Sequence, residues 1–527
     1  MSIRWLAYVS GALFAVAACS PSSTDAERSQ GGADGTTAAS EGVDGSPVEP
    51  GSDVGQEGTL RLGILASAAL DPAAASPASV HDIVLADLLH DTLTALDDGG
   101  VPQPDMASFS ANADLTVWRF ELDQGATFAD GSVVTADDVV FSLDRVRGSG
   151  GDSLPALRLD DVESVVAVGP STVDITLRRP SAVLPETLAA PVYGISSKST
   201  VEGSIASGEL RLNASGDYVA VIESPSQLLL TRRAGTGPDG ISVELFESES
   251  LALDGFLAGD LDWTVAPPDR LSEVFERVGA RGVVPFHGGL FLGLDAGIAP
   301  LDSGDLRRAI ALAIDRQALA EAVFGPTAQA ATGVVPDGVP GGGGECRGVC
   351  GPASEAARAT VTETFPEGQS TPLRLLVDDT DSMGAVASVL AQQFDDVGLE
   401  VDVDAQPVAV YEQLITSGRQ QLFLFGWLGV SRTPAHHLPP LFSSASPDNL
   451  SGFAEEAIDE SLEATRTQPI VDVRASAWRD VEATILERVP VVPLVQFRTT
   501  GVLNPRVDGF VMRADGTLDL SALSLDG

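Results

Sequence analysis

The sequence predicts an α/β fold, and three observations indicate it. Apolar and polar residues alternate in 117–122 and 171–177, as they do in half-buried strands. Apolar residues recur at helical spacing in 135–146 and 301–326, between and after these strands. The hydrophobic fraction is 44%, which is ordinary for a globular protein with a substantial core. The length of 527 residues corresponds to about three or four domain-sized units.

The first 19 residues predict export and lipid attachment. Arg4 precedes an apolar run from Trp5 to Ala18, which is too short to span a bilayer and indicates a signal peptide over 1–18. The following motif, "VAAC", resembles the lipobox of bacterial lipoproteins, in which Cys19 would carry diacylglycerol after cleavage of the signal. An ordinary signal peptide with a chance cysteine is the alternative. No other apolar stretch of the sequence could span a membrane.

Residues 19–57 predict a flexible linker behind the lipidated cysteine. They are rich in Ser, Gly, Asp and Thr and contain almost no large apolar residues, so they cannot bury enough surface to fold. The first folded residues are expected near Thr59.

Acidic residues dominate the charge of the chain. Its 75 Asp and Glu residues outnumber 31 Lys and Arg residues, which gives a formal net charge of −44. Such a surface repels phosphate backbones, so nucleic acid is excluded as a partner. The charge is typical of a highly soluble protein, and attraction of cationic solutes is the second interpretation.

Two helices are expected in the first two thirds of the chain. Thr135 can cap the first helix, because Asp138 follows three residues later near its positive end. Residues 301–326 predict a second helix, with Leu306 and Ile310 facing inward and Gly325-Pro326 as its end.

The last third reads as alternating helices and strands. A helix is expected over 382–397, followed by an alternating strand over 399–405. The nearly continuous apolar run 421–427 predicts a strand buried on both faces, and 473–497 predicts a helix leading into a last apolar strand. Ligands of open α/β sheets bind beyond the ends of strands, which directs attention to Gly426-Trp427.

Seven segments together carry a family resemblance. In order they are "GTLRLGI…LDP" (58–72), "FADGSVVTADDVVFSLDRV" (128–146), "STVDITLRRP" (171–180), "LAGDLDW" (257–263), "LRRAIALAIDRQAL" (306–319), "FGW" (425–427) and "ERVPVVPL" (487–494). With these segments the chain resembles the extracellular solute-binding proteins of the peptide/nickel family, the capture subunits of ABC importers. The resemblance extends from about Thr59 to the C-terminus.

The resemblance implies a two-lobed, periplasmic-binding-protein-like fold with an enlarged first lobe and a ligand cleft between the lobes. Lobe I would comprise 58–287 plus 497–527, and lobe II would comprise 288–496. Two chain crossings between lobes form a hinge. The implied partners are a small solute, permease and ATPase subunits, and the membrane through the lipid anchor. A monomer without cofactor or enzymatic activity, on the extracytoplasmic face of the cell membrane, is expected.

The resemblance also places ligand-binding residues. Trp427, with its neighbours Gly426, Leu428 and Val430, would line the cleft; a core tryptophan is the alternative interpretation of Trp427. Peptide-binding members carry, at the position of Val430, an aspartate that holds the α-ammonium group of the peptide. Valine offers no charge to a buried ammonium, so recognition of a free peptide N-terminus is not expected. Three weaker candidates are Ser76, Ala78 and Phe497.

Three other motifs suggest further chemistry. His436 and His437 suggest a nickel-type chelate carrier, but adjacent side chains diverge, so no metal site is predicted. The string "GDSL" around Ser153 is the mark of an esterase family, yet no Asp-x-x-His follows it, so the match is attributed to chance. Cys346 and Cys350 are expected to form a disulfide in an exported protein.

Overall fold

The computed structural model describes residues 58–150, 153–207, 211–343, 346, 349–365, 372–418 and 420–525. The predicted signal peptide, the lipidated Cys19 and the linker lie outside these residues. Within them, no helix is both long and apolar enough to cross a membrane.

Three large sheets organise the chain. The first has the order β18 (Gly501–Leu503), β11 (Trp263–Val265), β1 (Thr59–Leu65), β10 (Gly240–Phe246), β9 (Gln227–Arg232) and β8 (Tyr218–Ser224). The second is antiparallel, with the order β4 (Ala107–Ala111), β5 (Val117–Leu122), β7 (Thr172–Leu177) and β6 (Val162–Ala167). The third has the order β13 (Ala328–Ala330), β17 (Val491–Arg498), β12 (Pro285–Leu294), β16 (Leu422–Leu428), β14 (Leu373–Asp378) and β15 (Val401–Gln406).

The helices cover these sheets, and three two-stranded ribbons accompany them. The longer helices are α2 (Val80–Leu89), α3 (Ala136–Arg147), α6 (Lys198–Ser207), α7 (Glu249–Ala258), α8 (Leu271–Val278), α9 (Gly304–Ala313), α10 (Arg316–Val323), α11 (Ser354–Thr364), α12 (Asp381–Asp395), α13 (Val408–Ile415), α15 (Glu456–Arg466) and α16 (Val471–Arg488). The short ones are α4 (Leu154–Arg158), α5 (Leu184–Leu188) and α14 (Leu438–Phe442). The ribbons are β2 (Thr94–Leu96) with β3 (Pro102–Pro104), β19 (Val507–Asp508) with β22 (Ser524–Leu525), and β20 (Val511–Met512) with β21 (Leu518–Asp519).

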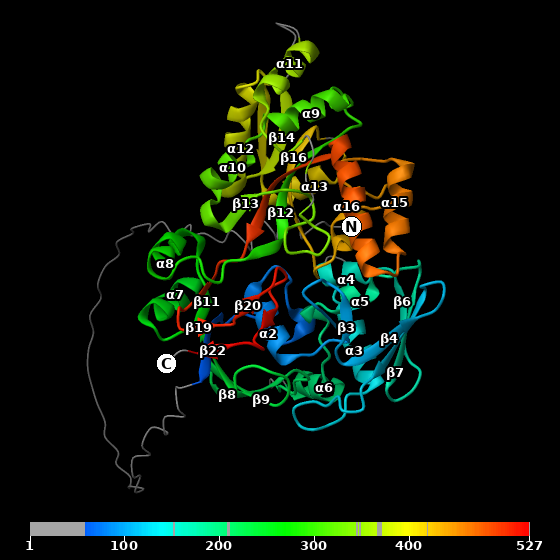
Figure 1. Cartoon of the computed structure of the whole chain (residues 1–527), viewed down its shortest axis with the longest axis vertical. Coiled ribbons are helices and arrows are strands. Elements are labelled where there is room, and N and C mark those ends of the chain that lie inside the picture. The colour runs from blue at the N-terminus through cyan, green and yellow to red at the C-terminus, as the bar shows by residue number, and fades with distance from the viewer. Residues whose placement is uncertain are drawn as a thin grey trace, which may run out of the picture.

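The third sheet stands above the other two in Figure 1, and the chain passes between the two levels at β12 and again after β17. The predicted crossings, near 290–295 and 492–497, fall in these two strands. The boundaries 58–287 plus 497–527 for lobe I and 288–496 for lobe II remain a prediction from the sequence.

The capping prediction for the first helix is confirmed. Thr135 accepts a hydrogen bond from the backbone N–H of Asp138, and the Asp138 carboxylate accepts one from the backbone N–H of Thr135 at 3.0 Å. This reciprocal capping box starts α3 at Ala136.

The single helix expected over 301–326 is wrong. The chain forms two helices, α9 and α10, because Ile314 leaves the helical conformation and Asp315 caps the second helix. The Asp315 carboxylate accepts a hydrogen bond from the backbone N–H of Ala318 at 3.0 Å. Aspartate is favoured as the N-cap of a helix, where it accepts hydrogen bonds from free N–H groups, and is disfavoured in the interior of a helix.

Strand β16 is buried along its whole length, as the run 421–427 predicts. Alternate side chains face opposite sides of a strand, so Phe423, Phe425 and Trp427 share one face. Gly293 of β12 makes room for this face, since a Cβ atom there would lie 2.1 Å from the ring of Phe423. The aromatic row ends at Trp427, where the two lobes meet.

Candidate functional site

The two lobes are joined by buried polar contacts next to α5. Arg474 of α16 forms an ion pair with Glu186 of α5, and both side chains are at most 6% exposed. Thr433 donates a hydrogen bond to the same carboxylate at 2.8 Å. Figure 1 shows α15 and α16 directly above α4 and α5. The contact therefore links the predicted lobe I to lobe II on one side of the molecule.

Trp427 lies at this junction, buried to 1% exposure. Its indole Nε1 donates a hydrogen bond to the backbone oxygen of His436 at 2.8 Å. The guanidinium of Arg158, at the end of α4, lies over the ring at 5.3 Å from its centroid, within the range of a cation–π contact. An element of each lobe thus contacts the tryptophan.

The other predicted residues do not all face the same way as Trp427. Leu428 projects from the opposite face of β16 and approaches Gly288, where a Cβ atom would lie 2.9 Å from its Cδ1. The same Cβ atom would lie 3.7 Å from the ring of Phe497, which also packs against Phe324 at 6.1 Å between centroids. Leu428 and Phe497 therefore both approach Gly288, at the boundary between the predicted lobes and away from the face of β16 that carries the indole.

Val430 is buried beside the chain turn that follows β16. Its N–H and that of Ser431 both point to Nδ1 of His436, at 3.4 and 3.2 Å. Two donors at Nδ1 place the ring proton on Nε2, which donates to Thr187 of α5 at 3.1 Å. His436 thus fixes the turn after Trp427 and bridges to lobe I.

Ser76 and Ala78, both half-buried, lie in the loop that precedes α2. The Ser76 N–H donates to Asp82 at 2.9 Å, so the loop is anchored to the first turn of that helix. Between the two candidates, the backbone oxygen of Pro77 faces Nε2 of His287 at 3.4 Å. His287 also accepts, through its backbone oxygen, a hydrogen bond from the N–H of Gly429 at 3.0 Å. It therefore links the loop of lobe I to the end of β16.

The histidines of this junction are neutral at physiological pH. Burial lowers the pKa of His287 to about 4. Burial, together with the neighbouring histidines and the Arg158 guanidinium, holds the pKa values of His436 and His437 well below their usual range. We call these three histidines with Arg158 and Trp427 the interlobe cluster. In the described part of the chain, no three histidine, cysteine or acidic side chains are grouped so as to hold a metal ion.

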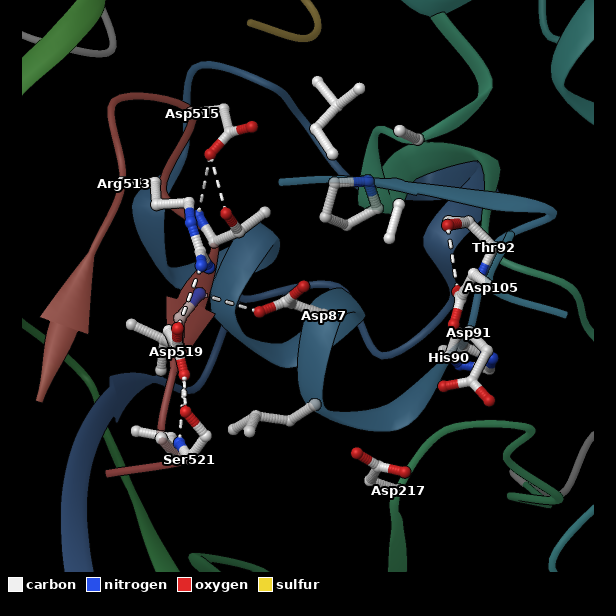
Figure 2. A pocket seen from close by; sticks show the side chains of 18 of the residues that line it. Asp87, His90, Asp91, Thr92, Asp105, Asp217, Arg513, Asp515, Asp519 and Ser521 are labelled. Carbon is white, nitrogen blue, oxygen red and sulfur yellow. Dashed lines mark hydrogen bonds and ion pairs between the residues drawn. The ribbon is translucent and has the colours of Figure 1, made fainter. Parts of the chain in front are cut away.

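A separate pocket of about 340 Å³ borders the C-terminal half of α2 (Figure 2). Six aspartates line it together with Arg432 and Arg513, and they are Asp87, Asp91, Asp105, Asp217, Asp515 and Asp519. Arg513 donates to Asp519 at 3.0 Å, and Arg432 reaches Asp515 at 3.2 Å from the segment that follows β16. This acidic pocket therefore lies mainly in lobe I and is bordered by one lobe II side chain.

Burial raises the pKa values of carboxyl groups in the acidic pocket. The pKa of Asp87 rises to about 7, although its carboxylate accepts a hydrogen bond from the N–H of Leu518 at 2.8 Å. The pKa values of Asp91 and Asp105 are raised by burial and by their acidic neighbours. Protons are thus retained in the acidic pocket close to neutral pH. None of the residues predicted to bind ligand lines it.

The chain matches the family model of the bacterial extracellular solute-binding proteins, family 5, over residues 101–449. The chain belongs to this family. The family resemblance and the two-lobed fold expected from the sequence are therefore confirmed. Like its homologues, this family 5 protein is a solute-binding protein of the kind that serves ABC importers.

Two curated relatives of this family 5 protein are named as peptide-binding proteins. The oligopeptide-binding protein OppA of Bacillus subtilis is 22% identical over 522 residues, covering 90% of this chain and 94% of OppA. The periplasmic murein peptide-binding protein MppA of Escherichia coli is 24% identical over 476 residues, covering 84% of this chain and 88% of MppA.

Solved structures share the fold. The unliganded open form of the murein tripeptide-binding protein MppA superposes with a TM-score of 0.78 at 21% identity, covering 89% of this chain and 98% of that one. NikZ of Campylobacter jejuni, in complex with Ni(L-His), gives 0.61 at 18% identity, covering 88% of this chain and 97% of NikZ.

Sequence reasoning missed Arg158, Glu186 and His287, three residues of the junction. The last was detectable, because His287 is one of only five histidines and adjoins a predicted crossing strand. Arg158 and Glu186 carry no local signal, since their partners lie far away in the sequence.

Proposed function

We propose that this family 5 protein is a lipid-anchored receptor that captures a peptide-like or other small solute between its lobes and delivers it to an ABC permease. The single observation that carries the proposal is the position of Trp427, at the end of a buried strand and in contact with Arg158 of the other lobe. Family membership and the peptide-binding relatives support the same function.

The chemistry of the junction favours a solute without an obligatory free amine. Val430 stands where peptide-binding members carry the acid that holds the ammonium group, and its side chain offers neither a charge nor an acceptor, while its backbone N–H is directed to His436. The three histidines of the interlobe cluster are neutral and Arg158 is cationic, so no acid of that cluster pairs with an ammonium group.

Calorimetry with two peptide pools tests the function. We expect a mixed pool of N-acetylated tripeptides to bind the purified protein, and the same pool with free N-termini to bind at most as well. Tight binding that requires the free amine would redirect the search to an acid elsewhere in the cleft. Failure of both pools to bind would contradict a peptide-like solute.

The second candidate is a nickel-chelate carrier, because the NikZ complex with Ni(L-His) shares this fold. Metal retained on the protein after purification and lost in a His437→Ala variant would favour it. The hydrolase interpretation of Ser153 has no support among the relatives, since OppA and MppA are binding proteins. An ester panel with a Ser153→Ala variant is its test.

The lipid anchor is a further part of the proposal. Expressed in a bacterium that processes lipoproteins, the mature protein should begin at Cys19 and partition with membranes. A Cys19→Ser variant should be released to the medium or remain unprocessed, because no thiol is present to accept diacylglycerol. Fractionation with mass spectrometry of the N-terminus measures both. A variant that stays membrane-bound and is trimmed at the same site would refute the lipobox interpretation.

A further inference from the structure

The interlobe cluster contains buried polar atoms that nothing in the described chain satisfies. Nε and Nη2 of Arg158 are shielded from solvent and have no hydrogen-bond partner, and neither ring nitrogen of His437 has one. His437 is 1% exposed, and His287, at 0%, leaves its Nδ1 unpaired as well. Unpaired buried donors are costly, and a guanidinium is more costly than a neutral group. Several such groups at one place, where two lobes meet, indicate that a ligand completes them.

The unpaired side of Arg158 has a defined geometry. Nε and Nη2 together form the edge of a guanidinium that binds a carboxylate with two parallel hydrogen bonds. The same molecule uses this edge elsewhere, where Arg119 donates to Asp174 through Nε and Nη2, both at 2.8 Å. The Nε–Nη2 edge of Arg158 has no such carboxylate partner among the described residues.

No protein acid takes that place. Asp160 and Asp448 act on the pKa of Arg158 from nearby, but neither forms an ion pair with it in the described structure, and burial is the larger influence that lowers this pKa. The other groups facing Arg158 are the neutral imidazoles of the cluster, the phenol of Tyr193 and the indole of Trp427. The groups nearest this cation are therefore mostly uncharged, the two acids act on it without an ion pair, and its Nε–Nη2 edge has no hydrogen-bond partner in the described structure.

We propose that Arg158 is the recognition residue for a carboxylate carried by the solute, with Trp427 stacked behind the guanidinium and His437 supplying a hydrogen bond beside it. The inference rests on the proposed capture function and names the chemistry of its solute. Separation of the lobes exposes the edge of Arg158 on lobe I, and closure of lobe II brings Trp427 and His437 onto the bound group. A carboxylate fits the planar two-donor edge, whereas an ammonium would be repelled by it.

The probes are two pools of N-acetylated tripeptides, one with a C-terminal carboxylate and one with a C-terminal amide, titrated calorimetrically into the full folded chain. We expect the carboxylate pool to bind wild type clearly more tightly than the amide pool. In Arg158→Gln, affinity for the carboxylate pool should fall about thirtyfold, the range for hydrogen bonds to a charged group, and affinity for the amide pool should hardly change. Arg158→Lys keeps the charge and loses the paired edge, so it should recover only part of the loss.

A second readout separates recognition from a structural role. Because Nε and Nη2 of Arg158 are buried without a hydrogen-bond partner, Arg158→Gln should melt at the same temperature as wild type or higher, whereas a structural arginine would lower it. The matched control is Asp448→Asn, which should retain the preference for the carboxylate pool. If Asp448→Asn lost affinity for the carboxylate pool as strongly as Arg158→Gln, Arg158 would act through Asp448 and not on the solute, and the proposal would be overturned. Equal binding of both pools by wild type would overturn carboxylate recognition by Arg158 but not the capture function. Binding of neither pool would overturn the capture of peptide-like solutes as well.

Discussion

Replacing Trp427 by alanine should weaken solute binding about a hundredfold, which corresponds to the loss of one central aromatic contact. The indole is held in one orientation by its bond to the backbone oxygen of His436 and by the guanidinium of Arg158. Alanine removes the ring face and also leaves that oxygen unpaired in a buried place. The calorimetric titration used for the peptide pools measures the loss, on protein shown by circular dichroism to be folded.

The control for this variant is Trp478→Ala. Trp478 lies on α16, is also 1% exposed and belongs to the same lobe by the predicted boundaries. Each truncation should cost stability on the order of 3–5 kcal/mol, as for other large aromatic residues in cores. Only the Trp427 variant should lose affinity. If both variants lose stability and both retain wild-type affinity, Trp427 is a core residue, which is the alternative interpretation of the sequence.

Breaking the buried ion pair between the lobes should reduce stability about as much as truncating a buried tryptophan. Arg474→Met keeps the volume of the side chain but leaves the Glu186 carboxylate buried without its cation, which costs about 3–5 kcal/mol. Urea unfolding at pH 8 measures this difference in the free energy of unfolding. Arg119→Met is the matched control, because the pair of Arg119 with Asp174 is largely exposed and should contribute less than about 1 kcal/mol.

The loss in Arg474→Met should depend on pH. Burial raises the pKa of Glu186 above the ordinary value of 4.5, and Arg474 opposes this rise, so its removal raises the pKa further. An acid with a raised pKa in the folded state destabilises the fold only when it is ionised. The penalty is therefore absent below the ordinary pKa and grows as the pH rises toward the folded pKa. The deficit should shrink near pH 4.5, and Glu186→Gln in the same background should recover much of it at pH 8. A deficit of constant size across this range would refute the charge-based explanation.

Much of the fold could be predicted, because local patterns determine it. The alternation in 117–122 and the apolar run 421–427 correspond to β5 and β16 almost residue for residue. Thr135 and Asp138 define the start of α3 through contacts three residues apart. The break between α9 and α10 was missed because the apolar spacing continues through Ile314, while the cap of Asp315 decides the outcome.

The candidate site was predictable only in part. Trp427 follows from a strand end, which is visible along the chain, whereas its contact with Arg158 joins residues far apart in sequence. The ion pair of Glu186 with Arg474 also joins residues that are far apart in sequence. Val430 shows in the sequence that the acid of peptide-binding members is missing. The residues around it do not indicate that the unpaired guanidinium of Arg158 lies across the junction. The missing information is the position of one lobe on the other.

The pairing of β18 with β11 sets the order in which the molecule can be completed. Leu503 lies opposite Trp263, and Val502 is fully buried in the same sheet, so lobe I lacks its edge strand until the C-terminal segment has been synthesised. The sheet of lobe II needs only the continuous stretch from β12 to β17 and can form first. Contacts between segments so distant in sequence form slowly, since the intervening chain must be ordered before they contribute. Completion of lobe I therefore waits for the last residues of the chain, whereas the sheet of lobe II does not.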